Sequence, residues 1–412
     1  MATPLRPKLR PLEITPFTSR GEQMLWMHDR LGIAPDAQLP VALAPLLSLF
    51  DGTRTVAQIV TSYALKGGET LPHWFVEKII GELDEQFFLE SPRFAARCQK
   101  VRGEFAASHS RPAAHAGQSY PAEPTALRHR LGSFFKEASQ LGAMPLACDP
   151  AKLRGIVVPH IDFTRGGAVE ALAYHELLRG HFDVFVILGI AHCGVRYPFC
   201  AAAKDYETPL GSARADMDFV RALERRIGER LLAEQFAHKN EHSIEFVAVF
   251  LQYLEQFKAA RIVPILCGGF HDEVQHQTSP AQNADVAQFC LALRDTVHEV
   301  EKAGQRVGFI ASVDLAHVGP NFGDREPVTP AHLRAIEKAD REFLACVELG
   351  GAEAMHAHFA RDNNARNVDA HPALYTLLLA FPELRAQLLH YTHADAPSKS
   401  IVSFASMVLY DS

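Results

Sequence analysis

Short apolar runs alternate with longer amphipathic stretches from about residue 150 to the end of the chain. The apolar runs predict strands at residues 154–158, 183–190, 261–267 and 306–314, and a late strand at 400–410 with one solvated face. Helical spacing of apolar residues predicts helices at 166–178, 217–227, 244–257, 286–303, 330–349 and 371–379. Alternating strands and helices predict an α/β domain with a mixed, mainly parallel sheet between helical layers. The first two strands, joined by a helix, are expected to form a parallel pair.

The first 95 residues follow a different pattern, with helical spacing over 36–50, a turn and second helix over 51–65, and a third helix within 71–91. Three short helices and a wing predict a small, mainly helical, winged-helix-like module at residues 1–95. Residues 96–119 are rich in Ala, Ser, Pro, His and charge without apolar periodicity, which predicts a linker. Residues 120–412 would then form the α/β domain. A helical bundle that only packs on that domain is the simpler alternative for the first module.

Charge and composition exclude several classes of partner. The net charge is −7, and residues 50–94 contain no basic recognition helix, so we expect no nucleic-acid partner. No apolar run approaches the roughly 20 residues needed to cross a bilayer, so we expect no membrane association. The first 17 residues lack the apolar core of a secretory signal. Seven cysteines, an odd number without a CxxC motif, fit reduced thiols, and together these features predict a cytoplasmic protein.

Three of the predicted strands deliver polar side chains where they end. The first ends at His160, the second at His192, and the fourth at Asp314 with His317 close behind. Ligands of open α/β sheets bind outside the carboxyl ends of the strands, and parallel neighbours bring those ends to one edge. We therefore expect these four side chains to meet in one cleft although they lie far apart in the sequence.

A further imidazole stands at the start of a predicted helix in the string "NEHSIEF", residues 240–246. The helix terminus favours the neutral form of His242, which can act as a metal ligand or a general base. Two or three imidazoles with open positions suit a redox iron or copper site, or a catalytic zinc. No pair has the HExxH spacing, and each histidine alone could be an ordinary packed or surface residue. His271 and His371 are weaker candidates for the same cleft, because packing explains each of them.

These strings together resemble the MEMO family, protein B of AmmeMemoRadiSam systems. The matching blocks are "YPAEPTALRHRL", "VVPHIDFTRGG", "VILGIAHCG", "ETPLG", "NEHSIEF", "VPILCG", "ASVDLAHVG", "AHPALYTLL" and "SIVSFASMVLY". They occur in the family's order over roughly residues 120–410. In the first module, "LLSLFDGTRTVAQIV" resembles PqqD-like domains, which bind peptides or partner proteins in peptide-modification systems.

The resemblance implies a fold similar to LigB-type class III extradiol dioxygenases, which use non-haem iron. It carries the family's metal-site positions onto His160, His192 and His242, with a further position at Ala316. Members that bind metal well tend to carry cysteine at that further position, whereas alanine has no ligand atom. Asn240 also replaces a family carboxylate. Both departures reduce the number of ligands and the negative charge at the site.

Two functions follow as expectations. In the first, the protein is a dioxygenase-like redox enzyme in which His160 and His192 hold Fe(II) or Cu and His242 is a third ligand or the acid/base. Asp314 with His317 would orient substrate or a metal-bound water. In the second, the same cleft binds a peptide or partner without turnover; a zinc-dependent hydrolase is a third option. The family's radical-SAM association implies a peptide or protein substrate and a radical-SAM partner.

Overall fold

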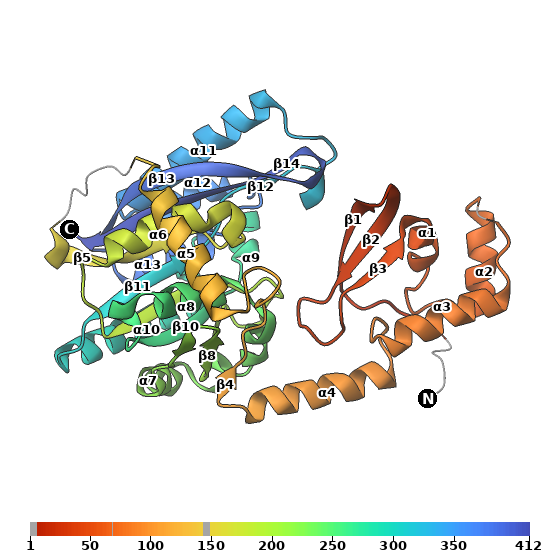
Figure 1. Ribbon diagram of the computed structural model, residues 1–412, viewed down its shortest axis with the longest axis horizontal. Coiled ribbons are helices and arrows are strands. Elements are labelled where there is room, and N and C mark those ends of the chain that lie inside the picture. The colour runs from red at the N-terminus through yellow and green to blue at the C-terminus, as the bar shows by residue number, and fades with distance from the viewer. Residues whose placement is uncertain (1–5, 68, 143–148) are drawn as a thin grey trace. The chain divides into compact units, whose positions relative to one another are not determined.

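The computed structural model describes residues 6–67, 69–142 and 149–412, and the chain divides into two compact units, Met1–Ser108 and His109–Ser412. The elements of both units are labelled in Figure 1. Among the described residues, no helix is long and apolar enough to cross a membrane.

The larger unit is built on a sheet of eight strands in the order β12-β14-β5-β11-β6-β10-β7, with β13 paired to β14. The four central strands β5, β11, β6 and β10 are parallel, while β14, β7, β12 and β13 each pair antiparallel with a neighbour. A mixed, mainly parallel core is therefore confirmed. The strands are β5 (Leu153–Val158), β6 (Val184–Ile190), β7 (Phe199–Ala201), β10 (Arg261–Cys267), β11 (Val307–Ser312), β12 (His317–Val318), β13 (Leu384–Ala396) and β14 (Ser400–Asp411).

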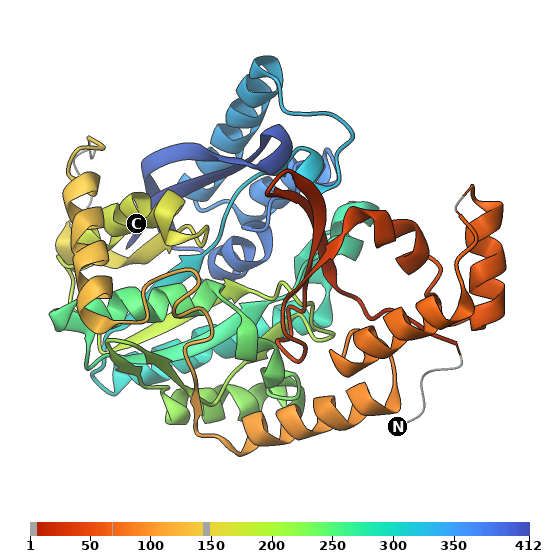
Figure 2. The same cartoon turned by 45° about the vertical axis from the view of Figure 1, so that its right-hand side comes forward.

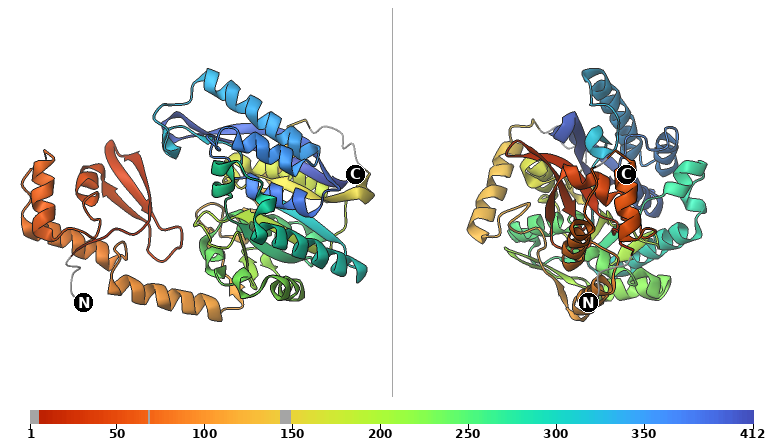
Figure 3. Two further views of the ribbon diagram at one scale, coloured as in Figure 1. Left: turned by 180° about the vertical axis from the view of Figure 1, so that it is seen from behind. Right: turned by 90° about the vertical axis from the view of Figure 1, so that its right-hand side faces the viewer.

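Helices cover both faces of this sheet, and each face has its own apolar core. On one face pack α5 (Pro124–Ala138), α6 (Phe163–Leu177) and α8 (Ser243–Tyr253); α5 and α6 lie side by side in Figure 2. On the other face pack α7 (Met217–Ile227), α10 (Ala284–Lys302), α11 (Pro330–Glu348), α12 (Ala352–Ala360) and α13 (His371–Ala380). Figure 3 shows β13 and β14 as a long ribbon beside α11. The remaining elements are β4 (Ser110–Arg111), β8 (Asp205–Thr208) and β9 (Gly211–Ala213), which form a small sheet, and α9 (His271–His276).

The smaller unit begins with an antiparallel sheet that the sequence pattern did not predict. Its strands are β1 (Glu13–Ser19), β2 (Glu22–His28) and β3 (Ala37–Pro40), and its helices are α1 (Ala44–Leu47), α2 (Val56–Leu65), α3 (His73–Glu85) and α4 (Pro92–Ala107). Arg20 and Gly21, both with positive φ, form the two-residue turn between β1 and β2. Thr55 and Gln58 form a capping box at the start of α2.

Several sequence-based predictions were wrong in detail. The helix predicted over residues 36–50 is strand β3 followed by two short helical turns, because Pro40 and Pro45 interrupt the backbone hydrogen bonds that one long helix needs. The late strand at 400–410 has no solvated face: β14 lies inside the sheet, with β13 along one edge and β5 and β12 along the other, and its residues 400–409 are buried. Strands β5 and β6 are parallel but not paired, because β11 lies between them.

The segment expected to be an extended linker, residues 96–119, is helical over its first half. Ser91 caps α4 by accepting a hydrogen bond from the Phe94 N–H, and Pro92 occupies the first turn, where its missing N–H costs nothing. The second half contains β4, whose Arg111 is wholly buried. Cys98, Val101 and Phe105 do recur at helical spacing within α4, with Val101 and Phe105 buried, and this short pattern was missed. Strand β4, with two residues, is too short to show any periodicity.

One buried group in the larger unit is poorly accommodated. Glu170 on α6 has no solvent exposure, and neither of its carboxylate oxygens has a hydrogen-bond partner. The Tyr174 hydroxyl, one helical turn further on, has none either. Burial raises the pKa of Glu170 well above its ordinary value of 4.5, and the nearby Asp314 and Asp162 act in the same direction. Glu170 is therefore a destabilising element of the fold.

Replacing Glu170 with Met should increase the free energy of unfolding by about 1–3 kcal/mol, because it removes an unpartnered buried carboxyl group. A pKa raised by folding means that the native state binds the proton more tightly than the unfolded chain. Wild-type stability is therefore lost as pH rises above about 4.5, and the advantage of Glu170→Met should grow with pH. Urea unfolding at pH 5 and pH 8 measures both effects.

Glu176→Met is the matched control on the same helix, since Glu176 pairs with Arg179 and should gain nothing by its removal. A loss of stability in Glu170→Met, or a gain that does not change with pH, would contradict the prediction.

Candidate metal centre

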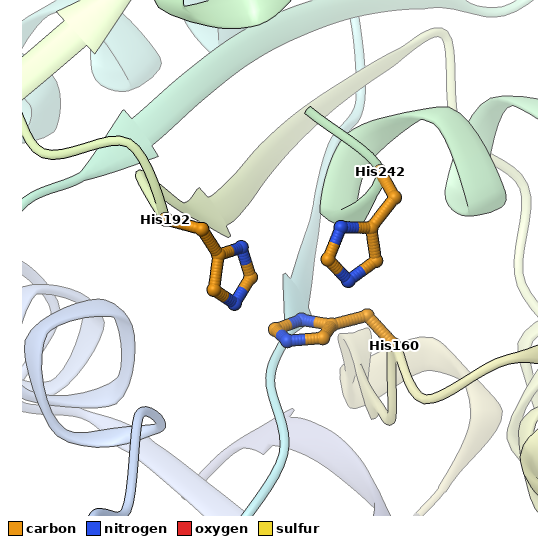
Figure 4. Close-up of side chains that lie close together, drawn as sticks. All are labelled: His160, His192 and His242. Atoms are coloured by element: carbon orange, nitrogen blue, oxygen red, sulfur yellow. The ribbon is translucent and has the colours of Figure 1, made fainter. Parts of the chain in front are cut away.

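Three imidazoles converge at the carboxyl edge of the central sheet. His160 follows β5, His192 follows β6, and His242 stands at the N-cap of α8. Each offers a ring nitrogen within 4.8 Å of those of the other two. Their ring centroids lie 5.1, 5.1 and 4.8 Å apart, and Figure 4 shows the three rings facing a common space. The described part of the chain has no other such group of potential metal ligands.

A close contact between β6 and the start of α8 brings the third imidazole into place. The Ile190 N–H donates to the Ser243 hydroxyl oxygen at 3.1 Å, and the Ser312 hydroxyl donates to the Ser243 carbonyl at 2.6 Å. A Cβ on Gly189 would lie 2.6 Å from the Ser243 hydroxyl oxygen, so only glycine permits this approach.

Each imidazole directs its Nδ1 atom to an oxygen acceptor. His160 Nδ1 lies 2.9 Å from the Ser312 carbonyl oxygen, and His192 Nδ1 lies 3.0 Å from Glu241 Oε1. His242 Nδ1 lies 3.2 Å from the same carboxylate oxygen. Because these oxygens only accept, each Nδ1 carries a hydrogen. Nε2 is then the atom through which each ring would bind a metal, and at His160 that atom also lies within hydrogen-bond distance of the Asp369 carboxylate. The pairing of Nδ1 with a carbonyl or carboxylate is typical of metal-binding histidines.

Glu241 holds two of the imidazoles by backbone as well as side-chain contacts. Its carboxylate accepts hydrogen bonds from the backbone N–H groups of His192, His242 and Ser243, at 3.1, 2.9 and 3.0 Å. Only 5% of the residue is exposed. A carboxylate in this place also complements the positive N-terminus of α8.

Arg111 anchors the backbone from which Glu241 projects. Its guanidinium is wholly buried and donates to the carbonyl oxygens of Glu241 at 2.7 Å and His238 at 2.8 Å. It also forms a buried ion pair with Glu245, which accepts further hydrogen bonds from the backbone of Ala114 and His115. Arg111 was not predicted, because the contacts that define its role come from residues more than 120 positions away.

Two aspartates complete the surroundings of His160. Asp314, expected from the sequence, accepts hydrogen bonds from the backbone N–H groups of His160 and Ile161 at 3.1 and 3.2 Å. Asp369 was not predicted. Its Oδ1 accepts from the Asp314 N–H at 2.8 Å, and its Oδ2 lies 3.1 Å from His160 Nε2 and 3.8 Å from His192 Nε2. The one available signal was its position directly before the "AHPALYTLL" block.

The carboxylates divide the three imidazoles into two charge states. Burial opposes protonation of His160 and His192, but Asp369 and Asp314 raise the pKa of His160 to about 9, and Glu241 and Asp369 raise that of His192 to about 10. Burial lowers the pKa of His242 to about 4 despite the opposing effect of Glu241. The imidazolium groups hold the pKa values of Asp369 and Glu241 below their ordinary range, even though burial acts against this.

The other predicted site residues lie outside the three-imidazole cluster. His317 begins β12, with its Nδ1 3.1 Å from the Leu315 carbonyl oxygen and 3.2 Å from that of Asn367. Ala316 is buried and bonded to Ser403 through its backbone N–H, and it presents only a methyl group. The carbonyl oxygen of Asn240 lies 3.0 Å from His115 Nε2.

The donor set fits a borderline transition metal. Three imidazole nitrogens with an adjacent carboxylate suit iron, copper or zinc, whereas Ca²⁺ and Mg²⁺ prefer sites made only of oxygen ligands. Side-chain exposure rises from 2% at His160 to 25% at His192 and 32% at His242. One side of the cluster is therefore accessible to a small molecule.

Comparison with known proteins finds one matching family. A family model described as Memo-like protein matches residues 111–408. A MEMO1 family protein of Aquifex aeolicus is 29% identical over 414 residues, covering 98% of this chain and the whole relative. A MEMO1 family protein of Pyrococcus furiosus is 28% identical and covers 71% of this chain and 97% of the relative, and one of Thermus thermophilus is 26% identical and covers 86% and 99%.

Replacing Glu241 with Gln should lower the pKa of His192 from about 10 toward or below 6.5, because the carboxylate is the main group that stabilises its imidazolium. NMR titration of the imidazole C–H resonance in metal-free protein measures the shift. Glu234→Gln is the matched control, since Glu234 contacts Arg196. An unchanged His192 titration in Glu241→Gln would refute the assignment.

Proposed function

The chain belongs to the Memo family, and we propose that it is a metal-dependent redox protein that holds Fe(II) or Cu through His160, His192 and His242. The observation that carries this proposal is the convergence of three imidazoles whose Nδ1 atoms are all engaged by oxygen acceptors. Asp369 contacts the Nε2 atoms of His160 and His192, and all three rings offer a nitrogen to one small space. Zinc would fit the same ligands and would then support hydrolysis instead.

A bound redox metal would supply electron transfer and polarise a substrate oxygen or nitrogen. The protein's own groups have separate tasks. Glu241 orients His192 and His242, and Asp314 holds the backbone from which His160 projects. Asp369 Oδ2 is placed to accept a hydrogen bond from a substrate donor beside the metal ligands. His242, largely neutral, serves as third ligand or as acid/base. His317 with Asp314 would orient the substrate.

The family resemblance also supports a proposal for the substrate and the partners of this chemistry. We propose a peptide or protein substrate, a radical-SAM partner, and recruitment through a PqqD-like N-terminal module in the cytoplasm. The alternative is a binding protein that accepts a peptide in the same cleft without turnover. Ala316 favours this alternative, since the family's further ligand position offers only a methyl group.

The metal content of the full-length protein separates the two functions. Protein purified without oxygen and supplied with iron should bind about one equivalent, and His160→Ala and His192→Ala should each lower the affinity at least about 100-fold. Elemental analysis and isothermal titration measure both. His175→Ala is the control, because His175 is exposed on α6 and should leave binding unchanged. Wild-type protein that binds neither iron nor copper would refute the redox proposal.

Restoring a ligand atom at Ala316 tests the family assignment of that position. Ala316→Cys should raise the affinity for iron or copper by about tenfold or more, because a thiolate is a strong ligand for both metals. Ala316→Ser is the matched control, with a similar volume and no thiolate. Equal affinities in the two variants would show that residue 316 does not face the metal.

A further inference from the structure

Of the three imidazoles in the cluster, His242 is the least firmly held by the groups described so far. Its side chain is the most exposed of the three, at 32%. The distance from its Nδ1 to an oxygen acceptor, 3.2 Å, is also the longest, compared with 2.9 Å for His160 and 3.0 Å for His192. Because His242 stands at the N-cap of α8, the place of its ring depends on what fixes the first turn of that helix.

The segment that runs from β4 to α5 holds this first turn. Glu245 lies in the first turn of α8, and its side chain is wholly buried. Its carboxylate pairs with the Arg111 guanidinium and accepts hydrogen bonds from the backbone N–H groups of Ala114 and His115 and from the Tyr120 hydroxyl. All of these donors lie in residues 111–120, at least 125 positions before Glu245 in the chain.

His115 extends this attachment to the third imidazole itself. Its Nε2 lies 3.0 Å from the carbonyl oxygen of Asn240, two residues before His242. A carbonyl oxygen only accepts, so Nε2 is the donor. The His115 ring also meets the ring of His242 edge to face, with the centroids 5.8 Å apart, and that of Phe246 with the centroids 6.1 Å apart. His115 therefore contacts both the ring of His242 and the backbone that leads to it.

Resting on the proposed metal centre, we infer that His115 is a positioning residue for the metal: its ring and its Nε2–H hold His242 in the orientation of a third ligand. Arg111 and Glu245 carry the segment from which His115 projects, so residues 111–120 belong to the metal site although none of them is a ligand. Groups that orient a metal-binding histidine in this way typically change the metal affinity by roughly 10- to 100-fold.

Two substitutions of His115 separate its ring contact from its hydrogen bond. His115 is half-buried and, unlike Arg111 and Glu245, is not part of a buried ion pair, so its replacement should leave the fold intact. In the full-length protein, His115→Ala should lower the affinity for Zn²⁺ by about tenfold or more. His115→Phe keeps a ring but not the donor and should recover part of this loss. His109→Ala, which replaces an exposed histidine on the same segment, should leave the affinity unchanged.

A double-mutant cycle distinguishes positioning of His242 from a general effect on the fold. If His115 acts through His242, adding His115→Ala to His242→Ala should lower the Zn²⁺ affinity by less than about twofold. The absorption spectrum of the Co²⁺-loaded protein, which responds to the number and geometry of the ligands, should change in the same direction in both single variants. Wild-type affinity in His115→Ala, or a full additional loss in the double variant, would overturn the inference.

A measurement on metal-free protein keeps this inference separate from the proposed metal centre. NMR relaxation of the imidazole C–H groups should show a more mobile His242 ring in His115→Ala, with His160 unchanged, because the ring contacts of His115 are with His242 and Phe246. Unchanged mobility of His242 would refute its positioning by His115 even if metal binds. Wild-type protein that binds no metal, with His242 mobile in the variant, would refute the metal centre and retain the positioning of His242.

Discussion

The convergence of the three imidazoles depends on one buried carboxylate, Glu241. Its two oxygens hold the ring and backbone of His192 and the backbone at the start of α8, so two separate segments are fixed by a single group. Burying an ionised carboxylate is unfavourable unless it is fully hydrogen-bonded and matched by positive charge. Here the helix N-terminus and the imidazolium of His192 supply positive charge. Three backbone N–H groups and His242 Nδ1 supply the remaining contacts to the Glu241 oxygens. The same contacts fix which nitrogen of His192 faces the other two imidazoles.

Much of this site was predictable because it follows from local periodicity and sheet topology. Apolar runs marked β5, β6 and β11, and parallel strands must end at one edge, so His160, His192 and Asp314 could be placed together. Asp369 could not be placed in this way. It lies on the loop between α12 and α13, where Asn363, Asn364 and Asn367 adopt left-handed conformations and the Asn364 side chain bonds both the N–H and the carbonyl of Val368. Such a path depends on individual side-chain contacts and leaves no periodic signal.

In the N-terminal unit the sequence did contain a strand signal, apolar residues at two-residue spacing, but this spacing was interpreted as helical. Ala37 and Leu39 in β3 are half-buried at the two-residue spacing of a strand, yet residues 36–50 were assigned to one helix; Val41 and Leu43 lie in the helical turn that follows β3. Leu25 and Met27 in β2 are buried at the same two-residue spacing, and the Arg20-Gly21 turn joins β1 to β2. Short apolar runs fit both periods, and the two prolines within residues 36–50 were the better guide.

The burial of Arg111 has a practical consequence for work on the isolated larger unit. An expression fragment begun at Tyr120, where the apolar pattern of the α/β region starts, would retain every imidazole of the cluster. It would nevertheless lack the guanidinium of Arg111. Glu245 would then be buried with no counter-ion, and the carbonyl oxygens of Glu241 and His238 would have lost their donor. Residues 109–119, predicted as part of a linker, are therefore an integral part of the larger unit. A truncated protein that keeps this unit intact starts no later than His109.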